Sequence, residues 1–397
     1  MGVRGRLSSW LVLVALVLAA GGAATGSILT ASPSHVTSTT TSTASPVITP
    51  PSYHVYATSA RASSVDFVNA EDGWVIGEDG GIISTTDGGR TWATSYSGPY
   101  SYVEGLDFAN ASDGWALTGD PWPMLATTNG GSTWSTFPAD TPWGRISGVD
   151  YVDQSEGWAI TRTGQLLFSS DGGAGWSPVN TPVPVGDVCA EAGGTAWVMG
   201  ADANIYDSVD DGRTWSTALT FRQVPFDIKP PQDLALYRDQ PYLACSGATI
   251  WAIYPEPNTT VAQPCVIERS TDAGGHWEPV TGPVAELPNT LFDVTSIGAS
   301  FPSDAWYFSV IYGATPWTLD VSTTTNAGAS FQTTVIPLRL AQHGNVALLG
   351  GTFINALDGW VVYTTQQNPP APLPVVLAAT VDGGQAWQVI DPSLPTA

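Results

Sequence analysis

The chain has 397 residues, with 35 Asp and Glu against 12 Lys and Arg, and its formal net charge is −23 at pH 7. Lys229 is the only lysine. Because nucleic acid phosphates require a basic protein surface, this composition excludes a nucleic acid partner.

Residues 1–30 have the pattern of an export signal. Arg4 and Arg6 precede an apolar run over residues 10–20, and small residues follow it. Cleavage near Ala24 would release the protein, whereas retention of the apolar stretch, about 20 residues, would leave a membrane anchor. Both alternatives predict an extracytoplasmic protein, either secreted or membrane-tethered by its N-terminal segment.

A linker follows this leader. Residues 31–52 are mostly Ser, Thr and Pro, so we predict an extended, solvated stalk. Residues 53–397 form a domain that is long for a single average unit and suitable for an array of small repeats. No segment after the leader keeps a helical period, so this domain should be all-β.

One motif organises the domain: hydroxyl, x, Asp or Asn, x, Gly, x, x, aromatic. In the first copy, Thr85 to Trp92, the side chain of Asp87 should accept hydrogen bonds from its own turn. The closing aromatic should be buried against a neighbouring unit. The seven third-position residues, for which we predict structural roles, are Asp87, Asn129, Asp171, Asp210, Asp272, Asn326 and Asp382.

A second motif precedes the first one in each unit. Its clear copies are Asp72-Gly73-Trp74, Asp113-Gly114-Trp115, Glu156-Gly157-Trp158 and Asp358-Gly359-Trp360, and weaker copies end at Trp197, Trp251 and Trp306. In the first unit, residues 65–69, 73–77, 81–85 and 91–96 are predicted as four short strands, a to d. Stacked four-stranded units would bury both faces of each sheet and so accommodate 17 Trp.

The paired pattern resembles the Asp-box (BNR) repeat, and its layout is similar to the photosystem II stability/assembly factor family. The resemblance covers roughly residues 60–392. It implies a seven-bladed β-propeller of four-stranded antiparallel blades. Because Asp boxes also occur in sialidases, xyloglucanases and sortilin-type receptors, the repeat predicts the fold and leaves the function open.

Two enzyme interpretations are disfavoured. Phe221-Arg222-Gln223-Val224-Pro225 is similar to a sialidase motif, but here it follows the fourth box instead of preceding the first. Xyloglucanases place a carboxylate pair across a cleft between two propellers, and this chain has one. We therefore expect no catalytic residues, and we keep a carbohydrate-binding or glycoside-hydrolase-type propeller as the alternative.

The cysteines and a set of recurring carboxylates suggest two further features. Export implies an oxidising compartment, so we predict a Cys245–Cys265 disulfide, the alternative being three buried thiols with Cys189. Asp66, Asp107 and Asp150 recur in the first strands, where they would form either a cation-attracting rim or hydrogen-bonded strand positions. No Cys/His spacing fits zinc, so we expect no metal site and no cofactor.

Strand alternation predicts which turns share a face. The a–b turns and the boxes should lie on one face, and the b–c and d–a loops on the other. The insertions at 218–242, 254–264, 311–320 and 364–374 then fall on the second face, where binding usually occurs. The residues expected to bind a partner there are Arg145, Arg222, Lys229, Arg238, Arg339, Tyr100, Tyr102, Trp122 and Trp143.

These features together predict a monomeric, non-catalytic binding or assembly scaffold. The resemblance implies a protein partner, including a membrane protein, because photosystem assembly factors bind their client through an arginine-bearing propeller surface. The carbohydrate alternative implies a glycan ligand instead.

Overall fold

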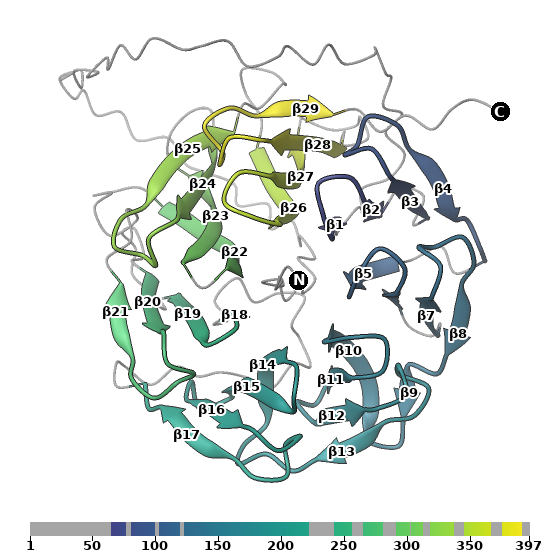
Figure 1. The fold of residues 1–397 in the computed structure, drawn as a ribbon, viewed down its shortest axis with the longest axis vertical. Helices are drawn as coiled ribbons and strands as arrows, with labels where there is room; N and C mark the ends of the chain where they lie inside the picture. The colour runs from purple at the N-terminus through teal and green to yellow at the C-terminus, as the bar shows by residue number, and fades with distance from the viewer. Residues whose placement is uncertain are drawn as a thin grey trace, which may run out of the picture.

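The computed structural model describes residues 65–76, 81–99, 103–119, 123–221, 242–255, 265–280, 291–301, 303–312, 318–336, 345–366 and 375–390. These residues form seven antiparallel sheets arranged as a ring (Figure 1). The described residues contain strands and no helix. The seven-bladed, all-β propeller predicted from the repeats is therefore confirmed.

Each blade runs outward from the ring centre in sequence order, and the first four blades are as follows. Blade 1 contains β1 (Val65–Phe67), β2 (Gly73–Ile76), β3 (Ile82–Thr85) and β4 (Ala93–Tyr96). Blade 2 contains β5 (Val103–Phe108), β6 (Gly114–Thr118), β7 (Met124–Thr127) and β8 (Ser135–Phe137). Blade 3 contains the additional β9 (Asp140–Thr141), then β10 (Gly144–Tyr151), β11 (Gly157–Thr161), β12 (Leu166–Ser169) and β13 (Ser177–Val179). Blade 4 contains β14 (Val185–Glu191), β15 (Thr195–Gly200), β16 (Ile205–Ser208) and β17 (Ser216–Leu219).

The last three blades repeat the same order. Blade 5 contains β18 (Tyr242–Ser246), β19 (Thr249–Pro255), β20 (Cys265–Ser270) and β21 (Glu278–Val280). Blade 6 contains β22 (Leu291–Phe301), β23 (Asp304–Tyr312), β24 (Thr318–Thr324) and β25 (Gln332–Ile336). Blade 7 contains β26 (Asn345–Phe353), β27 (Gly359–Gln366), β28 (Val375–Thr380) and β29 (Gln388–Ile390).

The tryptophan of the second strand is the main core residue of every blade. Trp74, for example, is 2% exposed and stacks on Phe108 of blade 2, with ring centroids 3.6 Å apart. The buried tryptophans at this position are Trp74, Trp115, Trp158, Trp197, Trp251, Trp306 and Trp360. Large aromatic surfaces buried between blades thus hold neighbouring sheets together.

In blades 1, 2, 3 and 7 a glycine precedes this tryptophan, and the aromatic side chain of the innermost strand requires it. Phe67 pairs across the sheet with Gly73, and a Cβ at Gly73 would lie 2.3 Å from the Phe67 ring. Gly114 has the same relation to Phe108, at 2.2 Å. The glycine therefore leaves room for the aromatic side chain that packs between two blades.

The tryptophan that closes each box is less buried than the sequence suggested. Trp92 and Trp387 are buried, at 5% and 9% exposure. The other four, Trp134, Trp176, Trp215 and Trp277, are half-buried and pack against the apolar clusters, so the predicted burial is only partial for these. All six precede the outermost strand of their blade, at the rim of the ring.

The ring closes by side-chain packing between blades 7 and 1. Trp360 of β27 stacks on Phe67 of β1, with ring centroids 3.7 Å apart and planes 5° from parallel. Both belong to one apolar cluster that contains Val65, Val362 and Leu377. Within the described residues, each blade consists of strands from one continuous segment.

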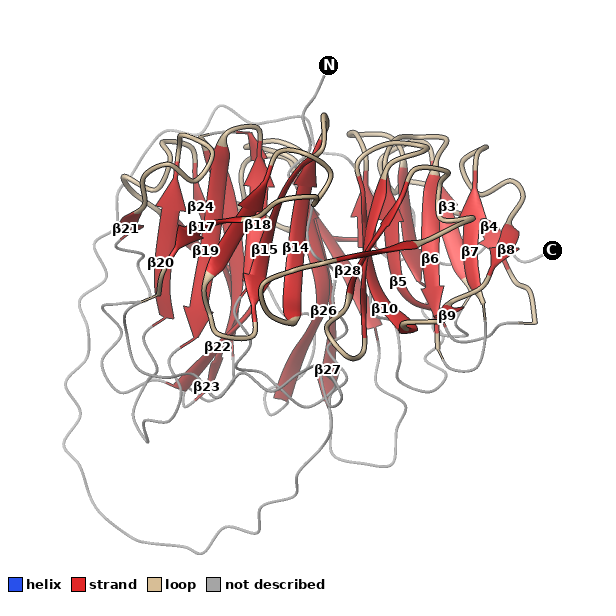
Figure 2. Ribbon diagram, turned by 90° about the horizontal axis from the view of Figure 1, so that it is seen from below, coloured by secondary structure: helices blue, strands red, loops and turns tan. Residues whose placement is uncertain are grey.

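The two faces of the ring differ as strand alternation predicted. Each box is hydrogen-bonded to the first turn of its own blade: Gly88 N donates to Glu71 O at 2.9 Å, and Gly130 N donates to Ser112 O at 2.8 Å. We call the face formed by these turns the box face and the opposite one the loop face; both are seen edge-on in Figure 2. The innermost strands run from the loop face toward the box face.

Candidate docking surface

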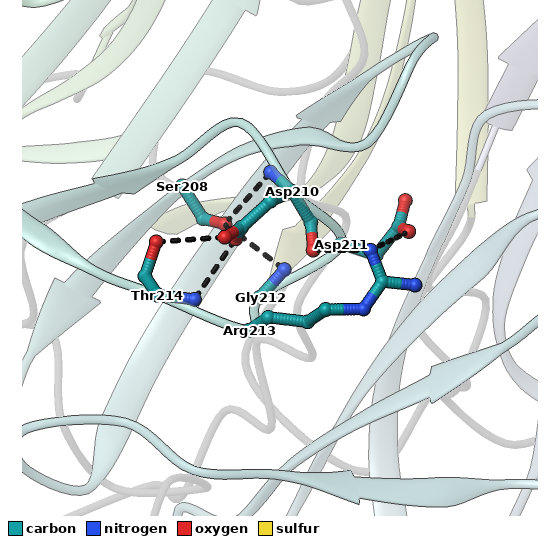
Figure 3. Close-up of polar contacts among 6 residues, drawn as sticks. All are labelled: Ser208, Asp210, Asp211, Gly212, Arg213 and Thr214. Carbon is teal, nitrogen blue, oxygen red and sulfur yellow. Dashed lines mark hydrogen bonds and ion pairs between the residues drawn. The ribbon is translucent and has the colours of Figure 1, made fainter.

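The Asp boxes are hydrogen-bonded within themselves. In the fourth copy, Asp210 Oδ1 accepts from Ser208 Oγ at 2.9 Å and from Thr214 N at 2.9 Å, and Asp210 Oδ2 accepts from Thr214 Oγ1 at 2.7 Å (Figure 3). Gly212 N donates to Ser208 Oγ at 2.9 Å and has a φ of 74°. A left-handed backbone of this kind favours glycine. The predicted structural role of the box carboxylates is therefore consistent with their geometry.

These hydrogen bonds also shift the acidity of the box. The pKa of Asp210 lies below its usual value because the Thr214 backbone N–H and then the Thr214 hydroxyl stabilise the carboxylate. At Asp272 the His276 side chain and then its backbone N–H lower the pKa to about 2. At Asp87 burial acts to raise the pKa, but hydrogen bonds from Thr91 and Thr85 outweigh it and lower the pKa. The box carboxylates thus stabilise their own turns by hydrogen bonding.

The carboxylates of the innermost strands join one blade to the next. The bonds run from Phe108 N to Asp66 Oδ2 (2.6 Å), from Tyr151 N to Asp107 Oδ2 (2.7 Å) and from Ala190 N to Asp150 Oδ2 (2.8 Å). We call these bonds the carboxylate clasps. Of the two interpretations that the sequence left open for these residues, the hydrogen-bonded one is confirmed.

The disulfide is not the one predicted. Cys245 of β18 is bonded to Cys189 of β14, which joins the innermost strands of blades 4 and 5. Cys265 could not form a bond with Cys245. Cys245 lies beside Ile250, and Ile250 pairs with Ser270 at the C-terminal end of β20, whereas Cys265 is at the N-terminal end of that strand and pairs with Pro255. Five residues along a strand span about 16 Å, beyond the Cα separation that a disulfide allows.

A continuous set of hydrogen-bonded loops crosses the loop face from blade 2 to blade 5. At its start, β9 pairs with β10, and the buried Arg145 guanidinium donates from Nη2 to Thr118 O at 2.8 Å. Arg145 Nη1 also lies 3.5 Å from Asp140 Oδ2. These contacts hold the β9–β10 hairpin, with Trp143 at its tip, against blade 2.

The following loops continue the connection. Arg162 N donates to Arg145 O at 3.0 Å, and Val185 N donates to Gly164 O at 2.8 Å. Ala201 N then donates to Pro184 O at 2.8 Å. The start of β14 therefore contacts both the turn between β11 and β12 in blade 3 and the turn between β15 and β16 in blade 4.

Blade 5 completes this surface. Phe221 N donates to Asn204 Oδ1 at 3.1 Å, and the Phe221 ring stacks on Tyr254 with centroids 3.8 Å apart. The Tyr254 hydroxyl donates to Ala203 O at 3.2 Å, and burial followed by the charges of Glu268 and Asp202 raises its pKa well above the usual value. We call the set of loops 139–146, 161–165, 183–185, 200–204 and 221 the loop belt. It is a preformed surface whose backbone is fixed by cross-blade contacts.

Two of the residues predicted to bind a partner lie in the loop belt. Trp143 is 37% exposed and is the one large exposed aromatic in the described part of the chain. Arg145 is 8% exposed, so the structure places its guanidinium beneath the hairpin and not at the surface. The other predicted residues lie outside the described residues: Tyr100, Tyr102, Trp122, Arg222, Lys229, Arg238 and Arg339.

One recurring turn residue was missed in the sequence. Asn69 Oδ1 accepts hydrogen bonds from Glu71 N and Asp72 N, and its Nδ2 donates to Asp72 Oδ2 at 2.8 Å. Asn110 and Asn355 repeat this arrangement three residues before Asp113 and Asp358. The signal was an Asn at fixed spacing before the Asp-Gly-Trp motif.

The described part of the chain contains neither a metal-binding cluster nor a membrane-spanning helix. No group of three or more His, Cys, Asp or Glu side chains there is arranged to hold a metal ion. Those residues also include no helix of the length and apolarity needed to span a bilayer. The predicted leader, residues 1–30, lies outside the described ranges.

Comparisons with known proteins give a family match and several structural neighbours. The family model described as photosynthesis system II assembly factor YCF48 matches residues 53–143. No curated protein matches the sequence. A solved structure of YCF48 bound to D1 peptide has a TM-score of 0.51 at 17% identity, covering 82% of this chain and 94% of that one.

Two further structures share the fold. YCF48 from Cyanidioschyzon merolae has a TM-score of 0.54 at 14% identity, covering 82% of this chain and 96% of that one. Selenomethionine-substituted virginiamycin B lyase from Staphylococcus aureus has a TM-score of 0.52 at 13% identity, covering 80% and 94% respectively. Since the neighbours include an enzyme, the fold alone does not determine function.

The repeats, the blade topology and the box geometry together define a class: the chain is an Asp-box seven-bladed β-propeller. Within that class, residues 53–143 match the family model described as photosynthesis system II assembly factor YCF48, and the ring shares its fold with the two YCF48 structures.

Proposed function

We propose that this propeller is a non-catalytic scaffold that binds a protein partner on its loop face, outside the cytoplasm. The observation that carries the proposal is the loop belt, which presents the exposed Trp143 on a backbone fixed across blades 2 to 5. A surface held in one conformation loses little entropy on binding, and tryptophan is common among the residues that dominate binding energy.

The choice of face follows from how the other face is used. The box carboxylates accept hydrogen bonds from their own turns, as Asp210 and Asp272 do. A ligand on the box face would compete with those bonds, whereas the loop belt carries its exposed side chains on an already satisfied backbone. The loop face is therefore the better docking surface.

The nature of the partner is inferred from the comparisons. One neighbour is titled YCF48 bound to D1 peptide, so a protein of this fold and family accommodates a peptide. A peptide segment of a membrane protein is accordingly the partner that we propose for this chain. The engagement of the described box and clasp carboxylates in structural hydrogen bonds favours binding over catalysis.

The proposed location is supported by the cysteine chemistry. The Cys189–Cys245 disulfide is of the kind that persists in oxidising, extracytoplasmic compartments. The basic and apolar leader of residues 1–30 favours the same location. Whether the leader is cleaved or retained, the propeller would be exported.

Site-specific photo-crosslinking in the native host tests the proposal. A photoreactive amino acid at position 143 should capture a membrane or exported protein, and the same residue at Thr271, on the box face, should capture much less. Capture only from position 271 would contradict docking on the loop face. Release of reducing sugar from glycans by the purified propeller would favour the carbohydrate alternative.

A further inference from the structure

The charge on the box face is strongly one-sided. Its turns bring together Glu71, Asp72, Asp87, Asp113, Asp153, Glu156, Asp171, Glu191, Asp210, Asp211, Asp272, Asp304, Asp358 and Asp382. In the described part of the same turns, Arg90 and Arg213 carry the full positive charges, and Arg213 is paired with Asp211 at 3.0 Å. The repeat itself produces this asymmetry, because every blade contributes its box and its first turn to the same face.

The exposed loop belt does not share that charge. Its described ionisable side chains are Asp140, Arg145, Arg162 and Asp202, two of each sign. Among the described residues, negative charge is therefore concentrated on the box face. The field of such charges acts on any charged surface that lies within a Debye length, about 8 Å at physiological ionic strength.

We infer that the box face is a repulsive surface which turns the propeller so that its loop face meets an anionic membrane. The negative surface potential of anionic lipids attracts cationic segments and, by the same interaction, repels carboxylates. The predicted stalk of residues 31–52 is long enough to let the ring turn at the membrane. The kind of partner that fits is then the extramembrane segment of an integral membrane protein.

This inference rests on the proposed function, because it concerns how the same loop face meets its partner. It also requires that the N-terminal segment hold the chain at the membrane. The two ideas can fail separately: crosslinking at position 143 reports on the partner, while the experiment below reports on orientation without one.

The experiment uses the full chain in vesicles of phosphatidylcholine with phosphatidylglycerol, in a Cys265→Ser background. A single fluorophore is attached through Thr163→Cys on the loop face or Val209→Cys on the box face, both of which are exposed positions. Quenching by a nitroxide-labelled lipid should be several-fold greater at 163 than at 209. The difference should disappear in phosphatidylcholine alone, and it should shrink at high salt.

A variant with reduced negative charge on the box face provides the direct control. The second positions of five boxes are exposed and neutral, and their side chains take no part in the box hydrogen bonds described above, so lysines can be added there: Thr86→Lys, Thr128→Lys, Ser170→Lys, Thr271→Lys and Thr325→Lys. The lysine variant should show a clearly smaller difference between the two probes, and the matched five-glutamine variant should keep the full difference. Equal quenching of the wild type, a difference that persists in neutral vesicles, or failure of the full chain to associate with vesicles would each overturn the inference.

Discussion

Cys189 and Cys245 occupy the two positions that form a carboxylate clasp at the earlier blade boundaries. Cys189 pairs with Trp197 just as Asp66 pairs with Trp74. Cys245 follows Ala244, the residue that pairs with Trp251, just as Phe108 follows Asp107, the residue that pairs with Trp115. A covalent bond thus replaces a hydrogen bond at an equivalent place. It also joins the two consecutive blades that lie farthest apart in sequence, since β17 ends at Leu219 and β18 begins at Tyr242.

Removing this disulfide should destabilise the propeller. The bond closes a loop of 56 residues, and in the chain-entropy model this contributes about 4 kcal/mol to the free energy of unfolding. The Cys189→Ala/Cys245→Ala variant should therefore unfold at a lower urea midpoint than the wild type. A midpoint unchanged from that of the wild type would show that the bond is dispensable.

The equivalence of the two kinds of link leads to a rescue experiment. In a Cys189→Asp/Cys245→Ala variant, the new carboxylate should accept the backbone N–H of residue 245, as Asp150 accepts that of Ala190. We expect it to recover about 1.5–3 kcal/mol relative to the double-alanine variant, a typical value for a hydrogen bond to a charged group. Equal or lower stability of the aspartate variant in urea unfolding would contradict the equivalence.

The two classes of tryptophan should respond differently to truncation. Trp158 is fully buried between blades, so Trp158→Ala should lower the free energy of unfolding by about 3–5 kcal/mol. Trp134 is half-buried at the rim, so Trp134→Ala should have less than half that effect. Equal losses for the two variants in chemical denaturation would contradict this assignment of the core.

Stability should pass through a maximum at mildly acidic pH. Burial raises the pKa values of Asp207, Glu268 and Asp320, so the native state binds their protons more tightly and stability rises as pH falls through those values. The box carboxylates Asp210 and Asp272 have lowered pKa values in the native state. Below about pH 4 these groups therefore bind more protons in the unfolded state than in the native state, and stability falls. Melting temperatures between pH 2 and 7 test this; Asp272→Asn should flatten the acid limb, and Asp207→Asn should reduce the rise.

A backbone position within the boxes offers a stabilising change. Ala327 has a φ of 54°, whereas the equivalent residue of the first box is Gly88. Ala327→Gly relieves about 1–2 kcal/mol of strain and loses about 0.4–1 kcal/mol through the unfolded chain, so a small net gain is expected. The reverse change, Gly88→Ala, should destabilise, because its Cβ would lie 2.7 Å from Ala70 O. A lower melting temperature for Ala327→Gly would contradict this account.

The fold could be predicted from the sequence because the repeat fixes local turns and their order. Box hydrogen bonds such as those of Asp210 depend on residues within five positions of one another, so the motif contains them. The Cys189–Cys245 bond depends instead on which side chains of two different blades face each other. Sequence proximity favoured Cys265 wrongly, because that residue lies at the opposite end of its blade.

The candidate site could be predicted in part, for a similar reason. Alternation of strands correctly separated the box face from the loop face. It could not show that Arg145 is buried, because the cause is a carbonyl of another blade, Thr118 O, which accepts from the guanidinium. The exposure of Trp143 likewise depends on the β9–β10 hairpin, which the repeat does not contain.

The seam between Trp360 and Phe67 has an evolutionary consequence. Because each described blade is one uninterrupted stretch of chain, duplication of a gene segment would add a complete blade together with its half of each contact to its neighbours. The first and last blades meet through the same kind of aromatic pair as interior blades do, as Trp74 and Phe108 show. Such a ring can grow or shrink by whole units while the contact that closes it keeps the same chemistry.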